Sequence, residues 1–173
     1  NAASLWPSTD HAPATRRSWF PRRKAKATSP LRSEAPASTG EATLSEEYRT
    51  LRARIQSLRR TRELRSIVVT STPAGEGKTT TASNLALGFG LAREGLTCLV
   101  DADLRTPRVH QVFRGAGAFG IVEVLEGDAK LDEALISVPD TRLMVLPVRA
   151  LPTAPSELLA SRYRAVTEEL EPV

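Results

Sequence analysis

The chain has few of the residues that build disulfide-bonded or metal-stabilised folds. Its 173 residues include one cysteine, Cys98, and two histidines. A single cysteine cannot form a disulfide framework, and it suits a reducing cytosol. The spacings CxxC and HxxxH do not occur in the sequence. A disulfide-rich secreted domain and a structural zinc module are therefore both excluded.

Long apolar runs, aromatic residues and methionine are also scarce. No apolar run reaches 18 residues, so we expect no membrane-spanning helix, and the first residues lack the apolar core of a signal peptide. Aromatic residues make up 5% of the chain, which predicts a mostly aliphatic core. The chain begins at Asn1 and its only methionine is Met144, so we expect it to be a fragment at its front end.

The positive charge is confined to the first quarter of the chain. Residues 1–40 hold seven Lys and Arg against two acidic residues, whereas residues 41–173 hold 17 basic against 18 acidic residues. The net charge of +4 therefore describes the amino-terminal segment rather than the folded part. This distribution argues against a basic globule that binds nucleic acid, so no nucleic-acid partner is expected.

Residues 1–43 are predicted to be a disordered basic linker, because they are rich in Pro, Ser, Thr and Ala and show no helical or strand period. The stretch RRSWFPRRKAK (16–26) places Trp19 and Phe20 inside a basic run. Two interpretations stay open for it. It is either a juxtamembrane segment that touches anionic lipid or a solvated linker, which is the usual state of such runs.

From residue 44 the pattern becomes that of an alternating α/β fold. We expect a helix over 44–64 with Ser45 as its cap, since Leu44, Leu51 and Leu58 recur at near-helical spacing. The next segments, in order, are a strand at 66–71, a glycine loop at 72–77, a helix at 78–95 ended by Gly95 and a strand at 96–101. A looser helical region at 107–137, a strand at 142–147 and a helix at 155–170 follow. A strand–loop–helix–strand unit of this kind predicts a mostly parallel sheet with flanking helices.

The loop sequence GEGKTT (75–80) is typical of a phosphate-binding loop. Glycines let backbone N–H groups approach phosphates, and the positive end of the following helix points to the same place. In this pattern Lys78 reaches the β- and γ-phosphates and Thr79 ligates Mg²⁺. The strict pattern is broken at Thr72, where its first glycine would stand. The predicted nucleotide-binding residues are Gly75, Glu76, Gly77, Lys78, Thr79 and Thr80.

A second constellation, Asp101-Ala102-Asp103, follows the strand at 96–101. Ligands bind at the carboxyl ends of strands in open α/β sheets, and residues i and i+2 of an extended chain point the same way. We therefore expect both carboxylates to face the phosphate site. One would hold Mg²⁺ and the other would accept a proton from an attacking hydroxyl. Lys78, Asp101 and Asp103 are the predicted catalytic residues, and Thr79, Asp101 and Asp103 the predicted metal ligands.

These motifs resemble a family. VTSTPAGEGKTTTASNLA (69–86) and LVDADLRTPRVHQVF (99–113) resemble the bacterial tyrosine kinases (BY-kinases) of capsular and exopolysaccharide biosynthesis. FGIVEVLEG (119–127) and LMVLPVRALPTAPSELLAS (143–161) also resemble the family's sequence patterns. The Walker A residues of the family fall on Lys78 and Thr79, and its DxDxR motif on Asp101, Asp103 and Arg105. Its oligomerisation pattern ExxRxxR falls on Glu46, Arg49 and Arg52 in the helix at 44–64. Arg149 departs from the pattern, since a glycine is expected there.

The resemblance implies a three-layer P-loop fold of the MinD/ParA kind, truncated before the Walker B strand, with residues 44–173 as the amino-terminal part of the kinase domain. It implies an ATP- and Mg²⁺-dependent protein-tyrosine autokinase that regulates polysaccharide synthesis and export. The expected partners are a ring of identical subunits, a transmembrane polysaccharide co-polymerase or adaptor, fused or separate, and tyrosine-containing proteins. The expected location is the cytoplasmic side of the cell membrane. The fragment itself is expected to be weakly active or inactive, because the Walker B strand and the tyrosine cluster of the family are absent from it.

Two other functions remain open. The first is a nucleotide-binding scaffold without kinase activity, which would regulate the polysaccharide complex by assembling and dissociating. The second is a ParA- or MinD-like ATPase. The ParA-like loop carries an additional lysine where this chain has Pro73, which argues against that assignment.

Overall fold

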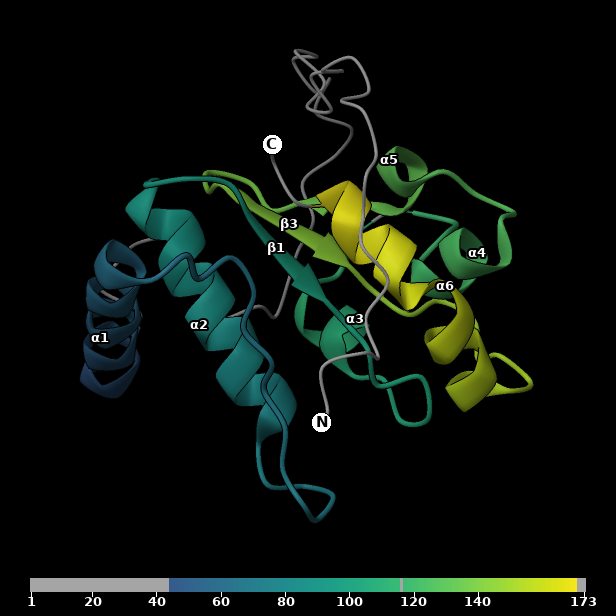
Figure 1. The fold of residues 1–173 in the computed structure, drawn as a ribbon, viewed down its shortest axis with the longest axis horizontal. Helices are drawn as coiled ribbons and strands as arrows, with labels where there is room; N and C mark the ends of the chain where they lie inside the picture. Colours follow the sequence, from purple (N-terminus) through teal and green to yellow (C-terminus); the bar gives the residue numbers. More distant parts are fainter. Residues whose placement is uncertain (1–43, 116, 171–173) are drawn as a thin grey trace, which may run out of the picture. The chain divides into compact units, whose positions relative to one another are not determined.

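The structure is a computed structural model that describes residues 44–115 and 117–170. The predicted linker 1–43, with its basic run at 16–26, lies outside the described residues. The helices are α1 (Glu46–Thr61), α2 (Lys78–Ala92), α3 (Val109–Val112), α4 (Ile121–Glu126), α5 (Leu131–Ala134) and α6 (Pro155–Leu170). The strands are β1 (Thr97–Val100), β2 (Ile136–Ser137) and β3 (Leu143–Leu146), and Figure 1 shows their arrangement.

The three strands form a small mixed sheet in the order β1-β3-β2. β1 pairs in parallel with β3, with Thr97 opposite Leu143 and Val100 opposite Leu146. β2 pairs antiparallel with β3, with Ile136 opposite Val145. The α/β class and the strands expected at 96–101 and 142–147 are confirmed. The two-residue strand β2 is an addition that the sequence pattern did not indicate, because so short a run carries no periodicity.

The strand expected at 66–71 is absent from the described residues. This segment has no assigned strand, and Val68 is 86% exposed and Ile67 46% exposed. Strands are stable only when a neighbour satisfies their backbone groups. None of the described strands pairs with residues 66–71, so the backbone groups of the β-branched run have no strand partner. The prediction of a strand here is therefore wrong for this structure.

Helices cover both faces of the sheet, because successive side chains of a strand point to opposite faces. Leu99, Leu143 and Val145 pack with Ala86 of α2 and Val109 of α3. On the other face Leu146, with Cys98 and Val100, packs against α4, α5 and α6 through Ile121, Leu125, Leu131 and Val166. Both clusters are aliphatic, as the low aromatic content indicated.

Two glycines of α2, Gly88 and Gly90, allow close packing against two different segments. A Cβ atom at Gly90 would lie 2.8 Å from Leu143 Cβ and 3.1 Å from Leu143 N, so glycine is needed for α2 to approach β3 this closely. Gly88 instead faces α1, where a Cβ would lie 3.3 Å from Leu44 Cδ1. α2 ends at Ala92 with Arg93 in the left-handed region at φ 55°. The last residue of the helix therefore lies three positions before Gly95, which the sequence pattern placed at its end.

The remaining helices follow the predicted segments with small shifts. α1 spans 46–61 of the expected 44–64, and Ser45 precedes it without the expected side-chain cap. The looser region at 107–137 becomes the three short helices α3, α4 and α5. α6 has the predicted bounds of 155–170. Within residues 44–115 and 117–170, no helix combines the length and the apolar character needed to cross a membrane.

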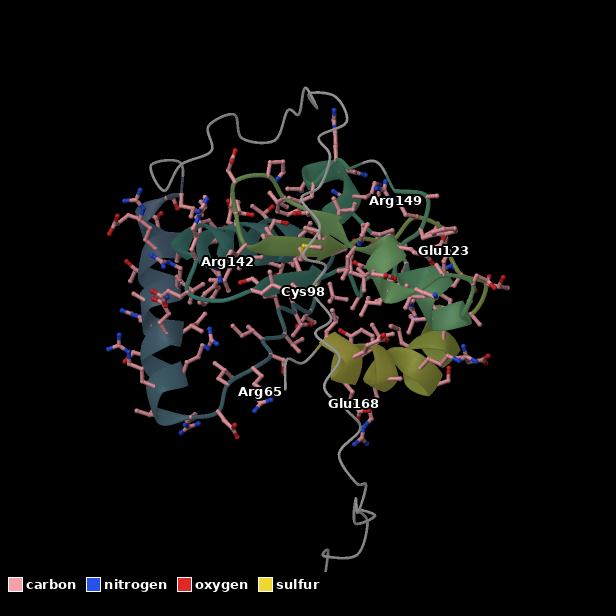
Figure 2. The ribbon with its side chains drawn as sticks, turned by 90° about the horizontal axis from the view of Figure 1, so that it is seen from above. Arg65, Cys98, Glu123, Arg142, Arg149 and Glu168 are labelled. Atoms are coloured by element: carbon pink, nitrogen blue, oxygen red, sulfur yellow. The ribbon has the colours of Figure 1, made fainter. Side chains whose placement is uncertain are left out.

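Cys98 gives the fold a measurable dependence on pH. Figure 2 shows it on β1, and burial raises the pKa of its thiol to about 12. The folded chain therefore keeps the thiol protonated above about pH 8.5, where the unfolded chain loses the proton. Fewer bound protons in the unfolded state mean that stability falls as pH rises.

Between about pH 8 and about pH 10, we expect this thiol to reduce the free energy of unfolding by about 2 kcal/mol. Urea unfolding at a series of pH values measures the loss, with Cys98→Ala as the control that lacks the titrating group. Equal pH dependence in the two proteins would show that the thiol is not buried in β1.

Candidate nucleotide-binding site

The loop at 72–77 has the backbone conformation of a phosphate-binding loop. Gly75 and Gly77 both have φ of 86°, in the left-handed region that side-chain-bearing residues rarely adopt. No heavy atom lies within 4 Å of the Cβ position of either glycine. The loop is thus bare on its outer side, where a phosphate group can approach the backbone N–H groups.

α2 begins directly after this loop and supplies the positive end of a helix dipole. Gly77 is its N-cap, and Thr81 N donates a hydrogen bond of 2.8 Å to Gly77 O. No acidic residue lies in the first turn of α2 itself, and the acidic residue next to it in the chain is Glu76 of the loop. Thr79 and Thr80 belong to this first turn, next to Lys78. The helix of 15 residues therefore directs the positive end of its dipole at the loop.

Lys78 folds back over the loop. Its Nζ donates to Ser71 Oγ at 3.2 Å and to Pro73 O at 3.4 Å. Ser71 Oγ in turn donates to Pro73 O at 3.1 Å. Ser71 is a site residue that the sequence analysis did not single out. Its position, one residue before the loop, was the available signal, but Ser71 was assigned to the strand expected at 66–71.

Asp101 is buried, at 5% exposure, and both of its carboxylate oxygens accept local backbone hydrogen bonds. Oδ1 accepts from Asp103 N at 3.2 Å, and Oδ2 accepts from Val109 N at 3.1 Å. Burial raises the pKa of Asp101, while these hydrogen bonds oppose the rise. The side chain thus ties the end of β1 to the start of α3.

Asp103 lies in a different environment and is more exposed. Its Oδ1 accepts from Thr106 N at 2.9 Å and from Arg105 N at 3.3 Å, and its Oδ2 accepts from Thr106 Oγ1 at 3.1 Å. The hydrogen bonds from Thr106 lower the pKa of Asp103, and the positive charge of Lys78 lowers it further. Asp103 is therefore the carboxylate that the ammonium group of Lys78 influences. The two aspartates thus differ in burial and in hydrogen-bond partners, and their common orientation toward the phosphate site stays a prediction.

Two arginines fasten the loops at this edge of the sheet. Arg105 donates to Ser156 Oγ at 3.3 Å, which links the segment after β1 to the first turn of α6. Arg149, in the loop after β3, donates to Gly115 O at 2.6 Å. Figure 2 shows Arg149 reaching across from that loop. The unexpected arginine at 149 thus bridges to the segment after α3.

The donor set at this edge fits a magnesium ion that keeps most of its water or phosphate ligands. Mg²⁺ is bound in nucleotide sites by one or two protein oxygens, with substrate phosphates and waters supplying the rest. The described residues contain no group of three or more His, Cys, Asp or Glu side chains placed to hold a metal without such help. Thr79 and Asp103 are the oxygen donors whose exposure suits this role.

The predicted oligomerisation residues lie apart from the loop. Glu46 and Arg49 form an ion pair of 3.9 Å on the first turn of α1. The Cδ atom of Arg52 lies 3.6 Å from the Cβ position of Gly88, near the middle of α2. Glu46, Arg49 and Arg52 therefore lie on α1 and are not part of the nucleotide-binding loop.

Comparison with known proteins agrees with this geometry. Tyrosine-protein kinase YwqD of Bacillus subtilis (strain 168) is 39% identical over 120 residues, which are 69% of this chain and 50% of that protein. The solved tyrosine kinase domain of BceF matches with a TM-score of 0.61 and 32% identity, over 72% of this chain and 50% of that chain. A chloroplast MinD homolog of Arabidopsis thaliana is 39% identical over 75 residues, which are 42% of this chain and 22% of that protein. No protein-family model matches the chain.

The loop, the helix N-terminus and the aspartates at the strand end define an α/β protein of the P-loop nucleotide-binding class. More particularly, the chain is a relative of the bacterial tyrosine kinases, as its motifs indicated. It spans about half the length of the curated kinases it matches.

We expect substitution of Asp101 to reduce the free energy of unfolding more than substitution of Asp103 does. Replacing Asp101 with alanine leaves the N–H groups of Val109 and Asp103 without acceptors, at a cost of about 2–3 kcal/mol. Replacing Asp103 with alanine exposes N–H groups that water can reach, at a cost of about 1 kcal/mol or less. Denaturant unfolding of the two variants measures both costs. Equal destabilisation by the two substitutions would contradict the environments described for them.

Proposed function

We propose that this chain is the amino-terminal part of a kinase domain that binds ATP with Mg²⁺ and transfers the γ-phosphoryl group to protein tyrosine. The observation that carries the proposal is the left-handed glycine loop with Lys78 folded over it and Asp103 under the influence of its charge. The tyrosine kinases among the relatives, matched over about half their length, supply the acceptor, and the resemblance of the motifs supplies the setting. That setting is the regulation of capsular or exopolysaccharide synthesis and export.

The residues of the loop would act mainly by position and charge. Phosphoryl transfer depends on aligned groups and on stabilisation of the charge on the transferred phosphate. Lys78 would leave Ser71 and Pro73 to meet the β- and γ-phosphates, and Gly75 and Gly77 would present backbone N–H groups. When bound, Mg²⁺ would neutralise part of the negative charge of the phosphates. Thr79 and Asp103 would hold the ion.

Asp101 would act chiefly through the loop that follows it. Both of its oxygens accept backbone N–H groups, so it fixes Asp103 and the start of α3 in place. We retain for it the predicted second role of accepting the tyrosine proton. Burial raises its pKa, and a raised pKa favours a carboxylate as a proton acceptor.

Two finer features belong to the same proposal. We propose that a further strand lies between β1 and residues 66–71 and completes a three-layer fold, because Val68 and Ile67 are exposed on a β-branched segment. We also propose that α1 joins identical subunits, with Glu46, Arg49 and Arg52 at the contact. No residue of α1 is fully buried in the described unit, and the part of its surface that faces away from α2, with Glu46, is exposed. The proposal also includes a transmembrane adaptor, with the kinase on the cytoplasmic side of the membrane.

The Lys78→Met substitution tests the proposal. The lysine loses its ammonium group while keeping a similar length, so we expect ATP affinity of the 173-residue chain to fall at least about tenfold. A fluorescent ATP analogue measures the binding. Arg142→Met, which removes an exposed charge outside the site, should bind ATP as the unaltered chain does.

The transfer of phosphate to tyrosine is tested in the full-length protein. Phosphotyrosine that forms with ATP and Mg²⁺ and disappears in the Lys78→Met variant would support the kinase. ATP binding without phosphotyrosine would favour the scaffold without kinase activity. Phosphate release stimulated by DNA or lipid would favour the ParA- or MinD-like ATPase, with which the chain shares its matched 75-residue stretch.

A further inference from the structure

The carboxyl end of α1 carries a concentration of positive charge that the nucleotide site does not use. Residues 54–65 contain five arginines and one acidic residue, Glu63. The arginines are Arg54, Arg59, Arg60, Arg62 and Arg65, here called the α1 basic cluster. Across residues 44–65 seven arginines stand against three glutamates, whereas residues 66–170 hold ten basic and 13 acidic residues. The positive and negative charges of the described unit are therefore separated along the chain.

The cluster is held in place by a short turn. α1 ends at Thr61, whose Oγ1 donates to Leu58 O at 3.0 Å, and Arg62 N donates to the same oxygen at 2.9 Å. Leu64 N then donates to Arg62 O at 2.8 Å, which reverses the chain direction. Residues 59–65 line an open hollow of about 450 Å³ at this turn. The turn thus brings four arginines to one shallow, open surface.

Glu63, the one acidic residue within 54–65, already forms an ion pair. Glu63 pairs with Arg65 at 3.0 Å, and Figure 2 shows Arg65 in the loop that follows α1. Within the part of the chain that the structure describes, no acidic side chain pairs with Arg59, Arg60 or Arg62. All three are exposed. Three guanidinium groups therefore share one surface without a counter-charge from the described unit, and such groups bind phosphate oxygens well.

We propose that the α1 basic cluster is a docking surface for the phosphate groups of an anionic lipid bilayer. The cluster contains no aromatic side chain on which a nucleic-acid base could stack. The chain also carries a second basic run at 16–26 that includes Trp19 and Phe20, and basic residues beside aromatic ones favour a membrane interface. An anionic lipid surface presents many phosphate groups side by side, and each Lys or Arg near it adds to the attraction.

The proposed surface is separate from the nucleotide site. The six residues 66–71 lie between the cluster and the loop at 72–77, a span of up to about 20 Å of extended chain. Figure 1 shows this segment leading from the end of α1 to the loop at the start of α2. Lipid binding by the cluster therefore leaves the nucleotide-binding loop uncovered and does not rest on the proposed kinase activity.

Vesicle sedimentation with the 173-residue chain tests the proposal. We expect the chain to bind vesicles that contain phosphatidylserine, to bind phosphatidylcholine vesicles much less, and to be released by salt. The triple variant Arg59→Gln, Arg60→Gln, Arg62→Gln should weaken binding at least about tenfold. The matched control Arg114→Gln, Arg142→Gln, Arg164→Gln loses the same charge from exposed positions elsewhere and should bind nearly as the unaltered chain does.

Three results would overturn the proposal. The first is equal weakening by the two triple variants, which would mean that only total charge matters. The second is loss of vesicle binding only when Arg22, Arg23 and Lys24 in the basic run are changed to glutamine. The third is a cluster variant that loses affinity for duplex DNA or an acidic protein but keeps its affinity for vesicles. Binding of the fluorescent ATP analogue verifies in each variant that the chain is still folded.

Discussion

The close approach of α2 to β3 is the constraint on which the rest of the structure depends. Gly90 lies so near Leu143 that a Cβ there would meet Leu143 Cβ at 2.8 Å. This contact fixes the carboxyl half of α2 on the sheet, and the chain then returns as β1 in parallel pairing with β3. Because β1 runs back along α2, the start of the helix and the end of the strand lie at the same edge. Lys78 and Asp103 influence one another for that reason, and any P-loop chemistry of this chain depends on how closely the helix packs.

Asp101 and Asp103, the two aspartates after β1, have different roles: the first holds the backbone in place, and the second is placed to bind a metal ion. Asp101 uses both oxygens to hold backbone N–H groups, and its burial raises its pKa. Asp103 stays more exposed, and hydrogen bonds from Thr106 together with the charge of Lys78 lower its pKa. A carboxylate that is stabilised as an anion beside the lysine suits Mg²⁺. The buried partner keeps that carboxylate in position.

Local patterns in the sequence predicted much of the fold. They failed where contacts with residues distant in the sequence determine whether a strand forms or where a helix ends. The bounds of α6 and the start of α2 follow from Pro155 and from the glycine loop, both local signals. The strand expected at 66–71 needed a neighbouring strand, which no local pattern can supply. The end of α2 at Ala92 rather than at Gly95 also involves a distant residue, since the C-cap residue Arg93 donates to Asp140 O at 3.0 Å across the fold. Ser71 was missed because its contact with Lys78 forms only once the loop has closed.

The central claim is that the loop at 72–77 and the start of α2 hold the phosphates of a nucleotide. Hydrogen exchange of the 173-residue chain, with and without ATP and Mg²⁺, tests it most directly because it reports on individual backbone N–H groups. The account predicts slower exchange at residues 75–80 and at the segment 103–106 when ATP is present. Unchanged exchange there, or protection confined to the arginines at the end of α1, would contradict it.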